Sequence, residues 1–243
     1  MNPADGVAVY EDNRAVEMYD VLYRSRKDYA AEARRVAELV RTRTPDARSL
    51  LDVACGTGNH LEHFATLFAD VAGTDLSKPM LSVAGRRLPG RPLLQADMRS
   101  LWVGRTFDAV VCMFSSIGYL RTFEDLAAAL RCMASHLSPD GTVVIEPWYF
   151  PDTFLDGYVA AHAVSEGNRA ITRVSHSTRV GDQTRMELHY LLAGADGVSH
   201  IKEIDLLTLF TRGQYEEAFA QADLKAELIA VDGGPGLFVG IRV

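Results

Sequence analysis

The stretch LLDVACGTGNH, residues Leu50–His60, decides the fold. Its first half, with Ser49 before it, is a short apolar run typical of a parallel strand that is buried on both faces. Gly56 and Gly58 follow, and glycine lets a backbone approach a ligand closely and adopt dihedral angles that a side chain would forbid. The stretch therefore predicts a buried strand, a ligand-binding loop and the beginning of a helix.

Strands and helices go on alternating over about 150 residues. The further strand-like runs are DVAGTDLS, PLLQADM, FDAVVCMFS and PDGTVVIEPW. Apolar residues recur at helical spacing over residues 29–43, 78–87 and 123–137, and Thr122-x-x-Asp125 is a capping signature before the last of these. This alternation predicts an α/β fold with a doubly wound, mostly parallel sheet, whose ligand site lies at the carboxyl ends of the central strands.

After Pro151 the pattern changes. The strand-like runs ITRVSHSTRV, TRMELHYLLAG and IKEIDLLTLF are separated by GDQ and ADGVS, which are typical of hairpin turns. They predict a small antiparallel sheet inserted over the ligand-binding edge. GQYEEAFAQA then predicts a helix, and AELIAV and GLFVGIRV predict two strands that return to the main sheet. We therefore expect residues 1–150 and 211–243 to form the core and residues 151–210 to form the inserted sheet.

The composition excludes several classes of partner. A net charge of −7 argues against nucleic acid, because binding to phosphates draws its affinity from clustered lysine and arginine. The opening MNPADGVAVYEDN lacks the features of a secretory signal, and no run approaches the roughly 18 apolar residues that span a bilayer. We expect a cytoplasmic protein with neither a nucleic-acid nor a membrane partner. Cys55, Cys112 and Cys132 are widely spaced in apolar surroundings, which predicts reduced, buried thiols and no metal site.

The glycine loop indicates an adenosine-type ligand. Asp75 follows it by about 20 residues at the tip of the next strand, where a carboxylate can accept both hydrogen bonds of a ribose diol. A dinucleotide fingerprint would have a third glycine where Leu61 stands, and GNHLEH lacks the lysine of a Walker loop. S-adenosylmethionine fits best, because it needs no phosphate cradle. Asp97 can accept from the adenine amino group and Met98 offers an apolar surface for the ring; alternatively, Asp97 caps the next helix and Met98 belongs to the core.

LLDVACGTGNH, GTDLS, QADMR and FDAVVCMFSSIGYL together resemble the class I S-adenosylmethionine-dependent methyltransferases. More narrowly, MYDVLYRSRKDYAAEA, EPWYFPDTFLDGY, RVSHSTR and GGPGLFVG resemble the nucleotide-linked aminosugar N-methyltransferases that make the dimethylamino sugars of macrolide-type antibiotics. The similarity runs over nearly the whole chain. It implies a Rossmann-like methyltransferase sheet and N-methylation of a TDP-linked deoxy-aminosugar in antibiotic biosynthesis.

The resemblance also implies a set of site residues. Tyr23 and Arg26 close over the methionine end of the cofactor, Asp75 holds its ribose, and Met113 lines the methyl-transfer channel. The other expected cofactor-binding residues are Ala54, Gly56, Gly58, His60, Leu76, Met80, Asp97 and Met98. The expected substrate-binding residues are Tyr19, Tyr29, Trp148, Arg173 and Arg185, with Ser116 and Tyr119 at the reacting amine. Without the family, the three tyrosines at 19, 23 and 29 are most simply a packing stripe on a helix.

Three departures from the family pattern bear on this site. Some relatives carry histidine where Tyr119 stands, so a histidine base is not implied. An arginine-bearing segment separates GGP from GLFVG in the family, whereas Gly236 follows Pro235 directly here, which leaves one diphosphate contact open. The stretch YRSRKDY is one residue shorter than the family pattern.

The chemistry of an amine acceptor sets the expected mechanism. Only a neutral lone pair can attack a sulphonium methyl, and partial desolvation beside that cation favours the neutral amine. We expect Ser116 and Tyr119 to orient the nitrogen for in-line displacement, with the proton leaving to water or to Tyr119. The alternatives are N- or O-methylation of another small molecule, an adenosyl-ligand-binding protein without catalysis, and an NAD-dependent oxidoreductase, which Leu61 opposes. The inserted sheet also offers an interface for a homodimer.

Overall fold

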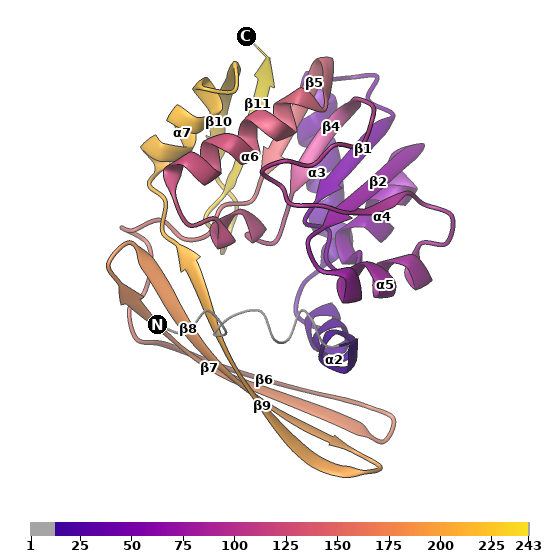
Figure 1. The fold of residues 1–243 in the computed structure, drawn as a ribbon, viewed down its shortest axis with the longest axis vertical. Coiled ribbons are helices and arrows are strands. Elements are labelled where there is room, and N and C mark those ends of the chain that lie inside the picture. The colour runs from indigo at the N-terminus through magenta and orange to yellow at the C-terminus, as the bar shows by residue number, and fades with distance from the viewer. Residues whose placement is uncertain (1–12, 243) are drawn as a thin grey trace.

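A seven-stranded sheet with the strand order β10-β11-β5-β4-β1-β2-β3 forms the main body of the fold (Figure 1). The computed structural model describes residues 13–242. Strands β1 to β5 are parallel, whereas β11 pairs antiparallel with both β5 and β10. This arrangement confirms the predicted doubly wound, mostly parallel sheet. Its strands are β1 (Ser49–Val53), β2 (Asp70–Asp75), β3 (Leu93–Gln95), β4 (Phe107–Cys112), β5 (Leu137–Ile145), β10 (Leu224–Ile229) and β11 (Leu237–Arg242).

Helices cover both faces of this sheet. Phe107 and Val110 of β4 enter one core with α6 and α7, whereas Ala109 and Val111 enter the other core with α3 and α4. A strand that is buried on both faces needs the continuous apolar run that this segment has. The helices of this body are α3 (Tyr29–Arg43), α4 (Asn59–Leu67), α5 (Lys78–Arg87), α6 (Phe123–Ser135), α7 (Arg212–Ala220) and the short 3-10 helix η1 (Ser116–Tyr119). The expected cap of α6 is present, because the side chain of Thr122 accepts a hydrogen bond from the backbone of Asp125.

A second sheet is inserted between β5 and α7. It has four antiparallel strands in the order of the chain: β6 (Tyr158–Glu166), β7 (Arg169–Val180), β8 (Gln183–Gly194) and β9 (Gly197–Thr208). The sequence predicts three strands, and the structure corrects this to four. The missed strand, β6, is YVAAHAVSE, in which alanine is common and beta-branched residues are few. It lies at the edge of the sheet, and none of its residues is fully buried, so its half-buried face carries only Ala160, His162 and Val164 and gives a weak apolar signal.

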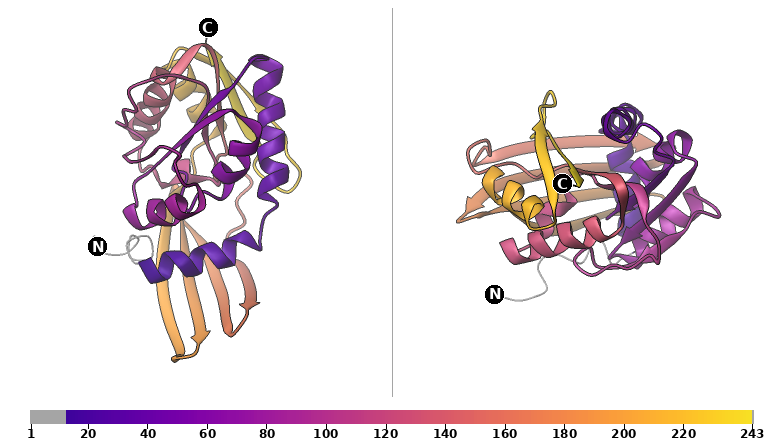
Figure 2. Two further views of the ribbon diagram at one scale, coloured as in Figure 1. Left: turned by 90° about the vertical axis from the view of Figure 1, so that its right-hand side faces the viewer. Right: turned by 90° about the horizontal axis from the view of Figure 1, so that it is seen from above.

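Helix α2 (Asn13–Arg24) lies across the space between the main body and the second sheet (Figures 1 and 2). Its residues Leu22 and Tyr23 pack with Ile171, Leu188 and Tyr190 on one face of the second sheet. The helix therefore closes one side of the space at the carboxyl ends of the parallel strands. Within residues 13–242, no helix has both the length and the apolar character needed to cross a bilayer.

The position of Leu61 explains how the fold tolerates a large residue where a dinucleotide fold has glycine. Leu61 is completely buried in α4. A Cβ atom added to Gly73 of β2 would lie 2.7 Å from Leu61 Cδ2 and 2.8 Å from Cys55 Sγ. Close packing of the helix on the strand requires a glycine at the contact, and here that glycine is Gly73 of β2 and not a residue of α4. Of the three free cysteines, Cys55 and Cys112 are buried as expected, whereas Cys132 is half-buried.

We expect Gly73→Ala to destabilise the protein by about 1–3 kcal/mol, because the added methyl group overpacks the contact with Leu61. Gly85→Ala in α5 is the matched control: its added Cβ would meet no atom closer than 3.8 Å, and alanine is favoured over glycine inside a helix by up to about 1 kcal/mol. Urea denaturation of both variants measures the difference. If the two variants are equally stable, the contact with Leu61 does not exclude a side chain at position 73.

Candidate active site

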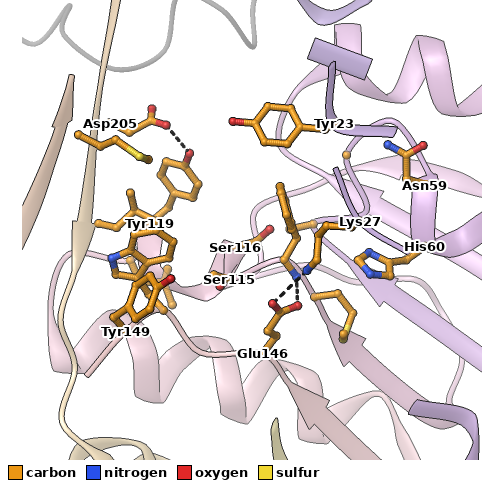
Figure 3. Close-up of a pocket in the computed structure, with 18 of the residues that line it drawn as sticks. Tyr23, Lys27, Asn59, His60, Ser115, Ser116, Tyr119, Glu146, Tyr149 and Asp205 are labelled. Carbon is orange, nitrogen blue, oxygen red and sulfur yellow. Dashed lines mark hydrogen bonds and ion pairs between the residues drawn. The ribbon is translucent and has the colours of Figure 1, made fainter. Parts of the chain in front are cut away.

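A cavity of about 920 Å³ lies where the parallel strands, α2 and the second sheet meet (Figure 3). This volume is at the upper end of the range for small-molecule sites, so the cavity has room for a nucleoside-sized ligand and part of a second one. The carboxyl ends of β1, β2, β4 and β5 form one wall, and β7, β8 and β9 form the opposite wall. In Figure 3, Tyr23 and His60 lie on one side and Tyr119 and Asp205 on the other.

The glycine loop presents its backbone to the cavity at Gly56. A Cβ atom at this position would meet nothing within 4 Å, and the residue has a φ of +56°. Gly58, with a φ of +80°, does not line the cavity; its added Cβ would lie 3.2 Å from Ala84 Cβ of α5. The expectation that both glycines approach the ligand is therefore corrected for Gly58, which serves helix packing. Ala54 also has a positive φ of 59° and lines the cavity, so the loop is strained next to the site.

Asp75 is fixed at the cavity wall by the protein's own backbone. Its Oδ2 accepts a hydrogen bond of 2.8 Å from the Gly56 N–H, and its Oδ1 accepts one of 2.8 Å from the Ser77 N–H. Each oxygen keeps a second lone pair, so the carboxylate can still accept from a diol. Burial raises the pKa of Asp75 against the effect of these N–H donors. Asp52, at the end of β1, is also buried at this wall, and one of its oxygens has no hydrogen-bond partner in the described part of the chain.

An apolar slot opens beside Asp75. Leu76 lines the cavity although 66% of it is exposed, and Met80 and Met98 lie in the same lining. Exposed apolar surface inside a cavity favours a flat ligand such as a nucleobase. Asp97 is held by Arg99, whose guanidinium and backbone N–H both donate to the carboxylate, and this contact lowers the pKa of Asp97. Contact of Asp97 with adenine stays a prediction.

The loop after β4 turns sharply and brings the expected reactive residues to the cavity. Phe114 and Ser115 both have a φ of 57°, and Glu146 at the end of β5 accepts a 2.7 Å hydrogen bond from the Phe114 N–H. The Ser115 hydroxyl donates to the Pro147 carbonyl over 2.9 Å. These contacts hold a strained turn, which is typical of functional sites. The result is that Met113, Ser116 and Tyr119, together with Trp148, line the cavity.

A chain of polar contacts joins this turn to the first turn of α4, next to the glycine loop. Lys27 Nζ lies 3.3 Å from Glu146 Oε1 and 3.0 Å from Glu32 Oε1, and His60 Nε2 lies 2.7 Å from Glu32 Oε2. The His60 ring also packs edge-on against Tyr29 with their centroids 4.8 Å apart. His60 lines the cavity, but its position is set by these protein contacts. Burial opposes the ionisation of Glu32, yet His60 and Lys27 together lower the pKa of that carboxyl.

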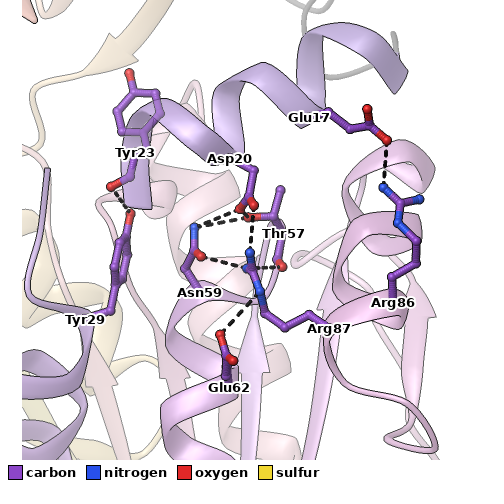
Figure 4. Close-up of polar contacts among 9 residues, drawn as sticks. All are labelled: Glu17, Asp20, Tyr23, Tyr29, Thr57, Asn59, Glu62, Arg86 and Arg87. Carbon is purple, nitrogen blue, oxygen red and sulfur yellow. Dashed lines mark hydrogen bonds and ion pairs between the residues drawn. The ribbon is translucent and has the colours of Figure 1, made fainter. Parts of the chain in front are cut away.

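Helix α2 is fastened to the glycine loop by a buried polar network (Figure 4). Asp20 accepts from Thr57 Oγ1 over 2.6 Å, from Asn59 Nδ2 over 3.2 Å and from Arg87 over 2.7 Å. Arg87 also donates to the Thr57 carbonyl over 2.6 Å. The network places Tyr23 over the cavity. Tyr19 and Tyr23 are on α2, whereas Tyr29 begins α3, so the three tyrosines are not one helical stripe, although all three line the cavity.

The inner face of the second sheet carries polar side chains. Arg173 is only 4% exposed and lines the cavity with Ser175, Ser177 and Asp205. Arg185 does not line it. Its strand partners Thr178 and Leu206 belong to the opposite face, and its guanidinium pairs with Glu187 over 3.0 Å. The expected role of Arg185 in substrate binding is therefore corrected, because one residue of offset along a strand reverses the face.

Two buried carboxyl groups lie two residues apart on β9. Asp205 Oδ2 accepts a 3.0 Å hydrogen bond from the Tyr119 hydroxyl, and Glu203 Oε2 accepts one of 3.5 Å from Tyr190. The other oxygen of each carboxyl group has no partner among the described residues, and neither has Arg173 Nε. Burial raises the pKa of both carboxyl groups, and the charge of Asp205 raises that of Glu203 further.

Several residues of the site were not anticipated from the sequence. They are Lys27, Asp52, Thr57, Asn59, Glu146 and Asp205. Asp52 had a signal, because it is a charged residue inside the apolar run LLDVA. Asp205 had no such signal, because in the run IKEIDLL both alternating faces of the strand carry a mixture of charged and apolar residues. The predicted residues that line the cavity, besides those located above, are Arg26 and Asp97.

We expect Arg87→Gln to weaken binding of S-adenosylhomocysteine by at least about tenfold and to lower stability, because it leaves Asp20 buried without its cation. Arg86→Gln is the control. Arg86 of α5 also pairs with α2, through Glu17, but both side chains are more than half exposed (58% and 54%), and such pairs are worth less than about 1 kcal/mol. Calorimetric titration of both variants gives the comparison. Equal losses would mean that α2 is not held by this network.

The raised pKa of Glu203 predicts a pH-dependent stability. A carboxyl group whose pKa is higher when folded makes the protein lose stability as the pH rises from the unfolded value, about 4.3, through the folded value. Glu203→Gln should therefore raise the melting temperature relative to wild type at about pH 8 and change it little at about pH 4. Glu187→Gln should lower the melting temperature relative to wild type at about pH 8, because Lys202, His189 and Arg185 lower the pKa of Glu187 and so stabilise its ionised form. Thermal unfolding at both pH values tests the sign.

Comparison with known proteins agrees with this geometry. Residues 50–141 match a methyltransferase domain family. The dTDP-3-amino-3,4,6-trideoxy-alpha-D-glucopyranose N,N-dimethyltransferase of Streptomyces venezuelae is 53% identical over 238 residues, which are 96% of this chain and 99% of that protein. The dTDP-4-amino-2,3,4,6-tetradeoxy-D-glucose N,N-dimethyltransferase of Saccharopolyspora spinosa is 44% identical over 241 residues, 98% and 96% of the two chains.

A solved structure resembles the whole fold. It is CalS10 with bound S-adenosylmethionine, an amino pentose methyltransferase from Micromonospora echinaspora involved in calicheamicin biosynthesis. The two structures superpose with a TM-score of 0.86 at 46% identity, over 93% of this chain and 97% of that one. The chain therefore belongs to the S-adenosylmethionine-dependent methyltransferases and, among these, to the N-methyltransferases of nucleotide-linked aminosugars.

Proposed function

We propose that this methyltransferase N-methylates the amino group of a TDP-linked deoxy-aminosugar in antibiotic biosynthesis. The observation that carries the proposal is a single cavity with two chemically different walls, one suited to a nucleoside and the other carrying a buried carboxylate beside a tyrosine hydroxyl. The relatives named above act on such sugars. In this proposal residues 1–150 and 211–243 form the core that binds the cofactor, and residues 151–210 form the inserted sheet that binds the nucleotide sugar together with residues of the core that border it.

The wall at the parallel strands suits S-adenosylmethionine. Gly56 offers open backbone, Asp75 offers a carboxylate for the ribose, and Leu76 with Met80 and Met98 offers an apolar slot for the adenine. A pyrophosphate would find no third glycine, since Leu61 is buried in packing. In this assignment Tyr23 and Arg26 close over the methionine end; the Arg26 guanidinium carbon lies 5.4 Å from the centre of the Tyr23 ring.

The opposite part of the cavity suits a nucleotide sugar. Trp148 and Tyr149 meet edge to face with centroids 4.9 Å apart, and Tyr149 adjoins Phe154, which gives an aromatic wall for a base. Gly233, Gly234 and Pro235 lie in the same lining, where the family's arginine-bearing segment is missing. Arg121 and Arg173 are the cations of this side that we assign to the diphosphate and the sugar.

The bound cofactor supplies an electrophilic methyl group on a sulphonium, to which a nitrogen lone pair bonds as the carbon–sulphur bond breaks. The protein must hold the amine neutral and aligned. Ser116 and Tyr119 lie at the turn after β4, next to Met113, where they can orient the nitrogen. Closure by α2 and the second sheet limits water, and desolvation disfavours the protonated amine.

Incubation with isotopically labelled S-adenosylmethionine tests the proposal. We expect label in dTDP-3-amino-3,4,6-trideoxy-alpha-D-glucopyranose, with one and then two methyl groups added in mass spectra, and none in the analogue that has a hydroxyl in place of the amine. The 4-amino sugar nucleotide serves as a second acceptor. Transfer only to small molecules without a nucleotide would refute the proposal, because the aromatic and cationic walls would then have no ligand.

A further inference from the structure

The turn after β4 has a backbone conformation that its own residues do not favour. Phe114 and Ser115 are consecutive and both have a φ of 57°, although neither is glycine. Such angles are costly for a residue with a Cβ atom and persist only where the surroundings impose them. Met113 and Ser116, on either side of this pair, line the cavity. The contacts that impose the turn therefore also set the position of these two residues.

Glu146 holds the turn on both sides of Met113. Its backbone N–H donates to the Cys112 carbonyl over 2.9 Å, and its Oε2 accepts a 2.7 Å hydrogen bond from the Phe114 N–H. The side chain of Glu146 is only 15% exposed. A carboxylate so far removed from water is stable only if a cation or further donors compensate its charge. The stability of this contact therefore depends on the group that faces the other oxygen of Glu146.

That group is the ammonium of Lys27, 119 positions away in the chain. Lys27 Nζ donates to Glu146 Oε1 over 3.3 Å and lies 3.0 Å from Glu32 Oε1 (Figure 3). It also lies 4.6 Å from the centre of the Phe114 ring, within the range of a cation–π contact. One charge thus contacts both the carboxylate that holds the turn and a side chain of the turn itself.

Lys27 is fixed in the connection between α2 and α3. On one side the Arg26 N–H donates to the Tyr23 carbonyl over 3.1 Å, and on the other Asp28 Oδ1 accepts from the Ala31 N–H over 2.9 Å. An ammonium has three donors, and Lys27 has three partners within the protein. Although Lys27 lines the cavity, its charge is therefore engaged by the protein and not directed at a ligand.

We propose that Lys27 is a positioning residue for methyl transfer, which acts through Glu146 and Phe114 to hold the turn after β4 at the cavity. The inference rests on the proposed function for its acceptor and adds to it the contact that keeps the reacting groups aligned. In-line displacement needs nitrogen, methyl carbon and sulphur in one line, and a misplacement of about 1 Å can lower a rate about 10²-fold. Without the charge of Lys27, Glu146 would be buried without its cation, and the strained turn could relax.

Methyl transfer to the aminosugar nucleotide by Lys27→Met, Lys27→Arg and Glu146→Gln tests this role. We expect Lys27→Met to lower kcat about 10²-fold, while the KM for the sugar and the Kd for S-adenosylhomocysteine change less than about threefold, because alignment is lost and binding is not. Lys27→Arg should restore most of the rate, since it keeps the charge. Glu146→Gln should be about as slow as Lys27→Met, and the double variant no slower than either, because one contact is lost only once.

Amide hydrogen exchange of residues 113–119 adds a readout that needs no acceptor. Exchange should be faster in Lys27→Met than in wild type and should return towards wild type in Lys27→Arg, because exchange reports local opening of the backbone. Arg43→Met is the matched control. Arg43, at the other end of α3, is buried to a similar degree as Lys27 (16% and 20% exposed) and pairs with Glu227 of β10; neither is among the described residues that line the cavity. This variant should leave the rate and the exchange of the turn unchanged.

Three results would overturn the inference. The first is a wild-type kcat in Lys27→Met, and the second is a loss of rate without faster exchange of the turn. The third is a loss of rate that only follows weaker binding of S-adenosylhomocysteine, because Lys27 would then contact the cofactor. If Lys27→Met does not fold, Glu146→Gln decides by the same measurements, since glutamine can still accept from the Phe114 N–H. If wild type methylates no aminosugar nucleotide, the proposed function fails, whereas the exchange measurement still decides the role of Lys27.

Discussion

The buried contact between Asp20 and Arg87 positions one whole wall of the active site. Two charges taken out of water are stable only when each is fully hydrogen-bonded, and Thr57 and Asn59 complete that requirement. Because Thr57 lies in the glycine loop, helix α2 cannot shift without disturbing the part of the cavity that the parallel strands form. The network in Figure 4 therefore also positions the aromatic side chains of α2, which pack on one face of the second sheet.

The cavity divides its chemistry between two sheets. The parallel sheet supplies open backbone, an apolar slot and the Asp75 carboxylate, which are suited to a nucleoside that carries no phosphate. The antiparallel sheet supplies Arg173 and Asp205, which are buried and of which one side-chain atom each has no hydrogen-bond partner within residues 13–242. Tyr119 stands between the two, on a turn that is strained at Phe114 and Ser115. A methyltransferase of this family needs both halves, because methyl transfer requires two ligands in one desolvated space.

Much of the fold is predictable because its signals are local. The apolar runs of β1 and β4 and the cap at Thr122 each act within a few residues and appear in the structure as expected, and so does Gly56 of the loop, whereas Gly58 packs against α5. Strand β6 is the exception, since this alanine-rich edge strand has no fully buried residue and its half-buried face is only weakly apolar. For the site, Asp75 could be placed at the cavity because strand ends of a parallel sheet meet at one edge, whereas Leu76 and Tyr119 were expected from the resemblance to the family. Arg185 could not, since its face depends on register.

The sequence by itself determined the class of fold, the family and the nature of the cofactor, because these depend on periodicity and on short motifs whose geometry is local. Only the tertiary structure decided which polar side chains share the cavity. The pairing of Tyr119 with Asp205 joins residues 86 positions apart, and that of Asp20 with Arg87 joins residues 67 apart. Such contacts follow from the way α2 and the second sheet pack on the main body, and this packing cannot be predicted from any short stretch of the chain.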